Sequence, residues 1–167
     1  HCHEMGHSFG AMDFYDTDYE SGGEFSGMGE WDLMASGSWN NEGISPAHFN
    51  PYVKTMFGWT ECETLAEGEA ELFPSLESNK VFRIDTGTEG DYFLLENRRQ
   101  AGFDSALPGS GLMIYHILPQ IEERAADNRI NAAYPQTCYP VCAGVEVAVP
   151  NKNPASYGRV NSSECPF

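Results

Sequence analysis

The chain is poor in basic residues. It has 9 Lys and Arg among 167 residues, against 25 Asp and Glu, which gives a formal net charge of −16. Proteins that bind nucleic acid or an anionic membrane surface depend on clusters of Lys and Arg. The composition therefore argues against both kinds of partner, and the surplus of carboxylates favours solubility in an extracellular setting.

The sequence also lacks a signal peptide and any apolar run that approaches the length of a membrane span. We therefore expect no membrane insertion. No C-x-x-C pair occurs either, so a structural zinc knuckle is not expected.

Five cysteines are present, and disulfides among them would point to a location outside the cytosol. They are Cys2, Cys62, Cys138, Cys142 and Cys165. The odd number leaves a free thiol or a partner outside the chain. Cys138 and Cys142 flank a predicted Tyr-Pro-Val turn and can bridge to each other or to Cys165, so the connectivity stays open.

The most informative feature stands at the start of the chain, which contains H-E-x-x-H-x-x-G-x-x-D. On a helix, His3 and His7 lie four residues apart and point the same way, so both imidazoles can reach one Zn²⁺. Glu4 is placed to hold and deprotonate the attacking water. Gly10 lets the chain leave the helix abruptly and bring Asp13 back as a third ligand. Three protein ligands leave a fourth position open, which is typical of a catalytic zinc site.

The third ligand has alternatives. Asp13 stands where the longer metzincin-type signature more often has His, and Asp16 and Asp18 are the fallback. A rival arrangement takes its third ligand from a Glu on a separate downstream helix. The nearest candidates are Glu20, Glu24 and Glu30. They lie in a stretch rich in Gly and Ser that is not expected to be helical, so Asp13 is preferred.

Two further features bear on this site. Residues 31–39 read WDLMASGSW and place Met34 in a tight turn of small residues, as a Met-turn beneath the zinc requires. Alone, Met34 would be read as ordinary core; beside the histidine motif we interpret it as a Met-turn. Tyr15 and Tyr19 are candidate donors to the oxyanion of the reaction.

A second metal is a separate hypothesis. Residues 13–18 read DFYDTD and form the densest cluster of oxygen ligands in the chain. Ca²⁺ prefers such ligands, although the spacing does not match an EF-hand.

Periodicity predicts an α+β chain. Residues 1–10 are predicted to be the second half of the active-site helix, and residues 11–44 a long ordered loop. Ser45 as N-cap and Pro46 at the first helical position predict a packing helix to about Phe57, which a second proline, Pro51, can break or restart.

Short strands separated by Gly, Pro and Asp turns are expected from about residue 63. The predicted strands are 69–73, 80–84, 91–96, 112–118 and 144–149, followed by a loop from residue 150. We predict the C-terminal part of a zincin- or metzincin-like catalytic domain over residues 1–62. A β-rich module over 63–150 packs on it, and 151–167 form a loop that begins a further segment.

Two polar sites in the β-rich part have ordinary interpretations. His116, near a strand end, is favoured as a satisfied core or edge histidine, with a role in the cleft as the alternative. Residues 96–99, ENRR, are expected to form hydrogen bonds or ion pairs that join the two parts, with a direct substrate contact as the alternative.

With these motifs in place, the chain resembles the immune inhibitor A family of secreted bacterial metallopeptidases. The matching blocks are His3–His7 with Gly10 and residues 13–16, then residues 29–40, 57–59, 92–98 and 109–116. The first two blocks together are highly specific. The resemblance covers about residues 1–120 strongly and the remainder loosely.

The resemblance implies a secreted zinc endopeptidase that cleaves proteins or peptides. It implies that His3, His7 and Asp13 bind zinc and that Glu4 is the general base and acid. It also implies a precursor with an inhibitory prosegment, and stabilisation by calcium.

The chain begins inside its own motif, so we expect a fragment that lacks the N-terminal part of the catalytic domain. This expectation keeps two other functions open. One is a non-catalytic zinc-binding or protein-interaction module, and the other is a metal-dependent hydrolase that acts on non-peptide bonds.

Overall fold

The computed structural model of the chain describes residues 1–19, 25–144 and 159–167. The α-helices are α1 (Cys2–Ser8), α2 (Pro51–Met56) and α3 (Ile121–Ala126), and 3-10 helices cover Gly29–Trp31, Ser36–Gly43 and Gly102–Ala106. The strands are β1 (Glu61–Thr64), β2 (Lys80–Asp85), β3 (Tyr92–Arg98), β4 (Gly111–Ile117) and β5 (Cys138–Val141). The predicted α+β class is confirmed. None of the described helices is long and apolar enough to cross a membrane.

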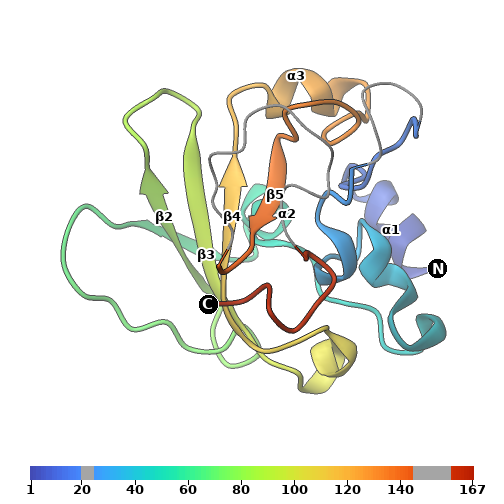
Figure 1. Cartoon of the computed structure of the whole chain (residues 1–167), viewed down its shortest axis with the longest axis horizontal. Coiled ribbons are helices and arrows are strands. Elements are labelled where there is room, and N and C mark those ends of the chain that lie inside the picture. Colours follow the sequence, from blue (N-terminus) through green and yellow to red (C-terminus); the bar gives the residue numbers. More distant parts are fainter. Residues whose placement is uncertain (20–24, 145–158) are drawn as a thin grey trace.

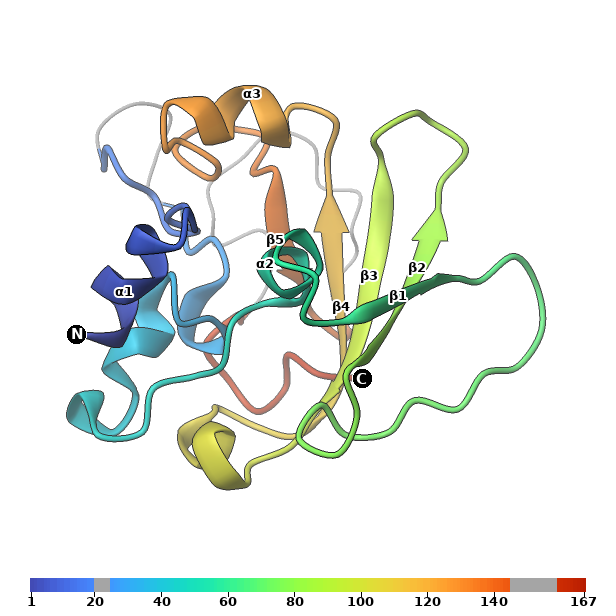
Figure 2. The same cartoon turned by 180° about the vertical axis from the view of Figure 1, so that it is seen from behind.

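The strands form one mixed sheet in the order β1-β2-β3-β4-β5. β1 runs parallel to β2, and the other neighbours are antiparallel. Figures 1 and 2 show α1 and β2 at opposite ends of the long axis of the molecule, with α2 against one face of the sheet. The C-terminal residue pairs with the start of β4, because Phe167 and Leu112 exchange two backbone hydrogen bonds of 2.9 and 3.1 Å.

Alternate side chains of β3 and β4 are buried on one face of the sheet, as the twofold period of a strand requires. These residues are Leu94, Glu96, Arg98, Met113, Tyr115 and Ile117. The same hydrophobic cluster extends into the N-terminal loops through Phe14, Met28 and Met34. A domain boundary at residues 62 and 63 stays a prediction.

The predicted start of the packing helix is wrong. α2 begins at Pro51, and Asn50 is its N-cap, accepting a hydrogen bond of 3.0 Å from the Val53 N–H through its side chain. Pro51 disfavours helical geometry in the residue before it, so Asn50 is extended and residues 46–50 carry no helix. The end of the predicted helix is confirmed to within one residue.

Among the predicted strands, 80–84, 91–96 and 112–118 are confirmed as β2, β3 and β4. The strand predicted at 69–73 is wrong, because these residues form no strand and β1 lies beside β2 instead. All four side chains of β1 are exposed, so hydrophobic periodicity gave no sign of it. Residues 145–149 of the last predicted strand lie outside the described residues.

The turn predicted between Cys138 and Cys142 is also wrong, because residues 138–141 form β5 on the free edge of β4. Pro140 is compatible with this place because β5 is itself an edge strand. Cys142 and Cys165 are free thiols whose sulfur atoms lie 3.3 Å apart, so the structure brings together one of the predicted pairs. α3 was not predicted.

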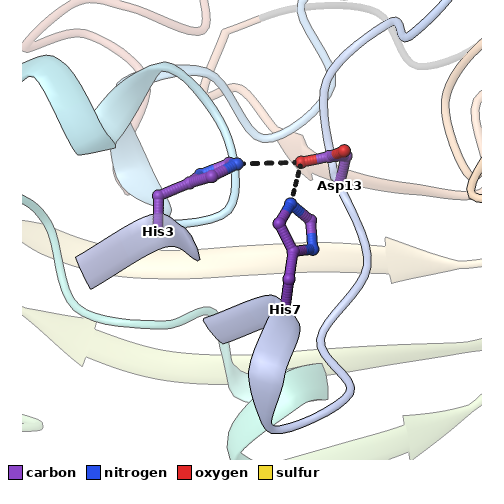
Figure 3. A group of neighbouring side chains, drawn as sticks. All are labelled: His3, His7 and Asp13. Carbon is purple, nitrogen blue, oxygen red and sulfur yellow. Dashed lines mark ion pairs between the residues drawn. The ribbon is translucent and has the colours of Figure 1, made fainter. Parts of the chain in front are cut away.

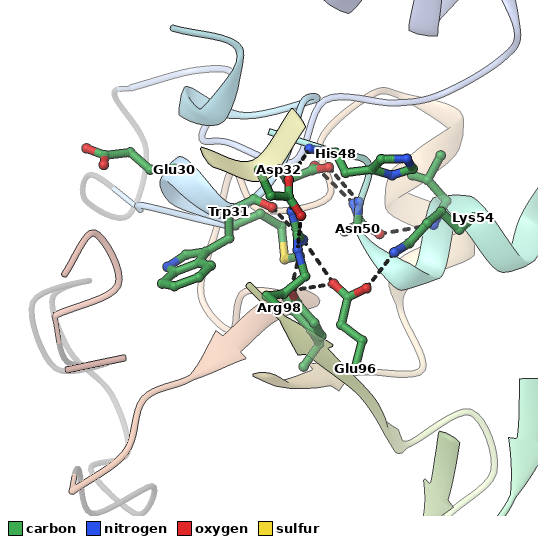
Figure 4. Close-up of polar contacts among 12 residues, drawn as sticks. Glu30, Trp31, Asp32, His48, Asn50, Lys54, Glu96 and Arg98 are labelled. Atoms are coloured by element: carbon green, nitrogen blue, oxygen red, sulfur yellow. Dashed lines mark hydrogen bonds and ion pairs between the residues drawn. The ribbon is translucent and has the colours of Figure 1, made fainter. Parts of the chain in front are cut away.

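Arg98 joins the sheet to the N-terminal part, as expected for residues 96–99 (Figure 4). Its guanidinium is fully buried, donates two hydrogen bonds of 2.8 Å to Asp104, and donates a third, of 3.0 Å, to the Trp31 carbonyl. Glu96 forms an ion pair with Lys54 of α2. The neighbouring Arg99 instead makes an exposed pair with Glu77.

Burial by itself raises the pKa of Glu96, but the Lys54 ammonium and the Arg98 guanidinium outweigh it and lower the pKa to about 2. A depressed carboxyl pKa stabilises the fold above the ordinary pKa of the group, and this stability is lost as the pH falls through the depressed value. The Glu96 carboxylate therefore stays charged through the whole neutral and mildly acidic range.

Met34 lies directly beneath α1. Its side chain is fully buried, and a Cβ placed on Gly6 would come within 2.4 Å of the Met34 sulfur. The same Cβ would come within 3.2 Å of the Phe49 ring. Glycine at this position therefore allows the helix to approach the turn closely.

Arg98→Met should destabilise the fold by about 3–5 kcal/mol, because it leaves Asp104 buried without its ionic partner. Arg99→Met is the matched control and should change the free energy of unfolding by less than about 0.5 kcal/mol, since its ion pair is exposed. Urea unfolding measures both variants. Equal effects of the two substitutions would contradict a structural role for the buried network.

Gly6→Ala should destabilise the fold by about 1–3 kcal/mol through the clash with Met34. Within an ordinary helix the same change stabilises by up to about 1 kcal/mol. A double-mutant cycle with Met34→Ala tests the cause, because the penalty should shrink when the sulfur is absent. A penalty independent of Met34 would show that this contact is not responsible.

Candidate metal centre

The site is built where α1 ends and the chain reverses. The backbone N–H of Gly10 donates to the His7 carbonyl, and that of Ala11 donates to the Gly6 carbonyl. Gly10 has a φ of 97°, which L side chains rarely adopt, so glycine allows this abrupt exit. Phe14 then donates a backbone hydrogen bond of 2.8 Å to the Met34 carbonyl. These contacts bring Asp13 back beside the helix.

His3 and His7 of α1 are both held by backbone carbonyls. The Nδ1 atom of His3 lies 2.9 Å from the Leu33 carbonyl oxygen, and the Nδ1 atom of His7 lies 2.8 Å from the Ala11 carbonyl oxygen. A carbonyl oxygen only accepts hydrogen bonds, so Nδ1 is the protonated nitrogen of each ring in its neutral form. Each Nε2 then presents an unshared electron pair, and the backbone fixes the tautomer and the ring orientation.

The Oδ1 atom of Asp13 meets both of these nitrogens. It lies 3.1 Å from Nε2 of His3 and 3.2 Å from Nε2 of His7, as Figure 3 shows. It is buried and has no hydrogen-bond donor. In the neutral state of the rings, three electron pairs therefore face one another without a proton between them.

A cation satisfies all three atoms at once. Tetrahedral zinc, with ligands at about 2.0–2.2 Å, holds its ligand atoms roughly 3.3–3.6 Å apart, close to the two contacts of Asp13. Among the described residues, His3, His7 and Asp13 form the one group of at least three His, Cys, Asp or Glu side chains arranged for a metal ion. Two imidazoles and a carboxylate are a donor set that suits zinc.

The remaining predicted residues of the site lie around this group. Glu4 is exposed on α1, one residue after His3. The Tyr15 ring lies 6.4 Å from the His3 ring, and Tyr19, largely exposed, stacks on Tyr15 at 6.3 Å. Burial, followed by the charge of Asp13, raises the pKa of Tyr15, so its hydroxyl keeps its proton at neutral pH.

The alternative third ligands are not brought to the two histidines. Asp16 is buried and accepts backbone hydrogen bonds from Asp18, Tyr19 and Phe25, so its carboxylate closes a loop. Asp18 forms an ion pair with Arg129. Glu30 is not in the group of possible metal ligands formed by His3, His7 and Asp13, and Glu20 and Glu24 lie outside the described residues.

The predicted calcium site gains no support from this geometry. Two of the carboxylates of residues 13–18 are engaged by backbone N–H groups and by an arginine, and the third faces the histidines. His116 has the ordinary role that was favoured. Its ring bonds to Asp91 and Tyr139 at 2.8 and 2.9 Å and stacks on Phe93.

Asn128, just after the C-terminal end of α3, forms two hydrogen bonds with Asp13, and no sequence pattern indicated this contact. The Asp13 backbone N–H donates to Oδ1 of Asn128, and Nδ2 of Asn128 donates to Oδ2 of Asp13, both at 2.7 Å. The two residues are 115 positions apart in the chain, and no motif links them.

Comparisons with known proteins find a peptidase family that matches part of the chain. Residues 1–60 match the family model described as immune inhibitor A peptidase M6, catalytic domain. The chain is 40% identical to immune inhibitor A of Bacillus thuringiensis subsp. alesti over 58 residues, which is 34% of this chain and 8% of that protein. It is 35% identical to pre-pro-metalloprotease PrtV from two strains of Vibrio cholerae serotype O1 over 81 residues, which is 44% of this chain and 9% of those proteins.

The matched part of the chain thus spans only a small share of the length of these relatives. No solved structure matches the chain. The match over residues 1–60 includes the whole histidine motif, the candidate Met-turn and α2. The resemblance of this chain to the immune inhibitor A peptidase family is therefore confirmed, and residues 1–60 carry it.

Proposed function

We propose that the protein containing this chain is a zinc-dependent endopeptidase and that His3, His7 and Asp13 are its metal ligands. The observation that carries the proposal is the buried Oδ1 atom of Asp13, which faces two Nε2 atoms and has no donor. A divalent cation removes the conflict among these three acceptors. The peptidase family matched by residues 1–60 implies a metal cofactor of this kind.

Zinc held by these residues would polarise the scissile carbonyl and lower the pKa of a water to roughly 7. The chain supplies the proton transfers. Glu4 directly follows the first proposed ligand on α1 and its side chain is exposed. In the proposed mechanism it takes a proton from the attacking water and delivers it to the leaving amine.

Other groups of the chain would orient the reaction. The Leu33 and Ala11 carbonyls keep the two imidazoles in the tautomer that ligates. Tyr15, whose ring lies 6.4 Å from the His3 ring, is our candidate donor to the oxyanion. Met34, packed beneath α1, takes the place of the Met-turn of a metzincin-like catalytic domain.

We further propose protein or peptide substrates, secretion, and a precursor with an inhibitory prosegment, as the family resemblance implies. The name of the Vibrio cholerae relatives, pre-pro-metalloprotease, agrees with a precursor of this kind. The net charge of −16 supports an extracellular setting and gives no support to a nucleic-acid partner.

Zinc should raise the melting temperature of the metal-free protein. Zinc at 100 times its Kd would stabilise the folded state by about 2.7 kcal/mol if one site binds and the unfolded chain does not. At that zinc concentration the gain should vanish in His7→Ala and Asp13→Ala, because loss of a ligand raises the Kd. It should persist in His116→Gln, because the native His116 ring contacts Asp91 and Tyr139 instead. Full stabilisation of the Asp13→Ala variant would overturn the proposed ligand set.

Glu4→Gln should lower the rate of casein cleavage by about 10²–10⁴-fold, because it removes the general base. The zinc content should stay at one equivalent, since Glu4 is not a proposed ligand. Glu67→Gln, another exposed glutamate, is the control.

The same assay separates the alternatives. Undiminished cleavage by Glu4→Gln would end the proposed mechanism. Zinc binding without any hydrolysis by the wild-type protein would favour a non-catalytic zinc-binding module, and hydrolysis of non-peptide esters alone would favour a different hydrolase.

A further inference from the structure

The amide of Asn128 contacts Asp13 at two points, and the chemistry of the partners fixes which atom faces which. A backbone N–H only donates, so it must face Oδ1 of Asn128. A carboxylate only accepts, so it must face Nδ2. Both contacts measure 2.7 Å and close a ring between the two residues.

This contact leaves Asp13 with one oxygen for any further partner. Its Oδ2 atom accepts from Asn128, while its Oδ1 atom is buried, lacks a donor and points at the two histidine rings. Hydrogen bonds at both the backbone and the side chain of Asp13 hold its rotamer. The carboxylate is therefore oriented toward the two histidines without the help of a cation.

Asn128 is itself held firmly. It has a φ of 54°, a left-handed conformation that asparagine adopts more readily than most residues. Its N–H donates to the Ala125 carbonyl at the end of α3, and its own carbonyl accepts a hydrogen bond of 3.0 Å from the Thr17 hydroxyl. The next residue, Arg129, pairs with Asp18. The turn after α3 is thus held by Asp13 and by the residues that follow it, Thr17 and Asp18.

The neutral amide also suits a metal site. A Lys or Arg in this place could donate to the carboxylate but could not accept from the Asp13 N–H, and its positive charge would compete with a cation. An amide directs the carboxylate and leaves its full negative charge available. Groups that hold metal ligands in this way typically account for 10–100-fold in metal affinity.

We propose that Asn128 is a positioning residue that presents a single carboxylate oxygen of Asp13 to the metal. The inference rests on the proposed metal centre and assigns a role there to a turn more than a hundred residues away. It predicts that Asn128 strengthens metal binding through Asp13 and without contacting the metal.

The test is a zinc titration of the complete protein against a chromophoric chelator. Asn128→Gly removes both hydrogen bonds and tolerates the left-handed backbone, and it should raise the Kd for zinc about 10–100-fold. Asn41→Gly is the matched control, because Asn41 has a φ of 50° and its side chain donates to Ser45, away from the metal centre. It should leave the Kd unchanged.

A double-mutant cycle distinguishes positioning from general stability. In an Asp13→Ala background, Asn128→Gly should have no further effect on the Kd, because its target is gone. An equal loss of affinity in both backgrounds would overturn the inference. Asn128→Gln, which keeps the amide but shifts it by one methylene, should also weaken zinc binding and serves if the glycine variant does not fold.

Different experimental results would overturn the two proposals. A wild-type protein that binds no zinc would overturn the proposed function, and this inference with it. Stoichiometric zinc binding by the wild type, with an unchanged Kd in a folded Asn128 variant, would overturn the positioning role alone.

Discussion

The buried Oδ1 atom of Asp13, which accepts from no donor, is the constraint around which the N-terminal part is arranged. Two imidazoles present electron pairs to it, and both are oriented by backbone carbonyls. An uncompensated cluster of acceptors is unfavourable in a protein interior, where an unpaired polar group keeps most of its desolvation penalty. In the proposed metal centre, a bound cation would supply the compensating charge, and the polypeptide supplies the geometry.

A metal centre of this kind needs rigid support, although much of the chain around it is loop. Support comes from a core that the sheet shares with the loops and from the buried network of Arg98, Asp104 and Glu96. Arg98 bonds the sheet to the Trp31 carbonyl, three residues before Met34. Met34 in turn packs under Gly6, and Gly6 lies between His3 and His7 in the sequence. A continuous path of contacts therefore connects the sheet with the floor of the site.

Local signals were reliable where one physical cause dominated. The histidine spacing, the glycine at the helix exit and the alternation of β3 and β4 each follow from backbone periodicity or a steric rule. The failures have equally local reasons. Ser45 and Pro46 form an acceptable helix start, yet Asn50 and Pro51 form another, and Pro51 disfavours helical geometry in the residue before it. β1 is exposed throughout, so no pattern marked it, and β5 was mistaken for a turn because of Pro140.

The sequence by itself determined which side chains of α1 share a face, where the chain can leave the helix, and that a carboxylate follows within reach. These properties depend on residues within one or two turns of one another. Tertiary structure alone decided how the Asp13 carboxylate is oriented, because Asn128, 115 positions away, donates to the oxygen that does not face the histidines. It also decided which nitrogen of His3 is free, since the Leu33 carbonyl occupies the other one. Such contacts arise only when distant segments pack, and no spacing within the chain encodes them.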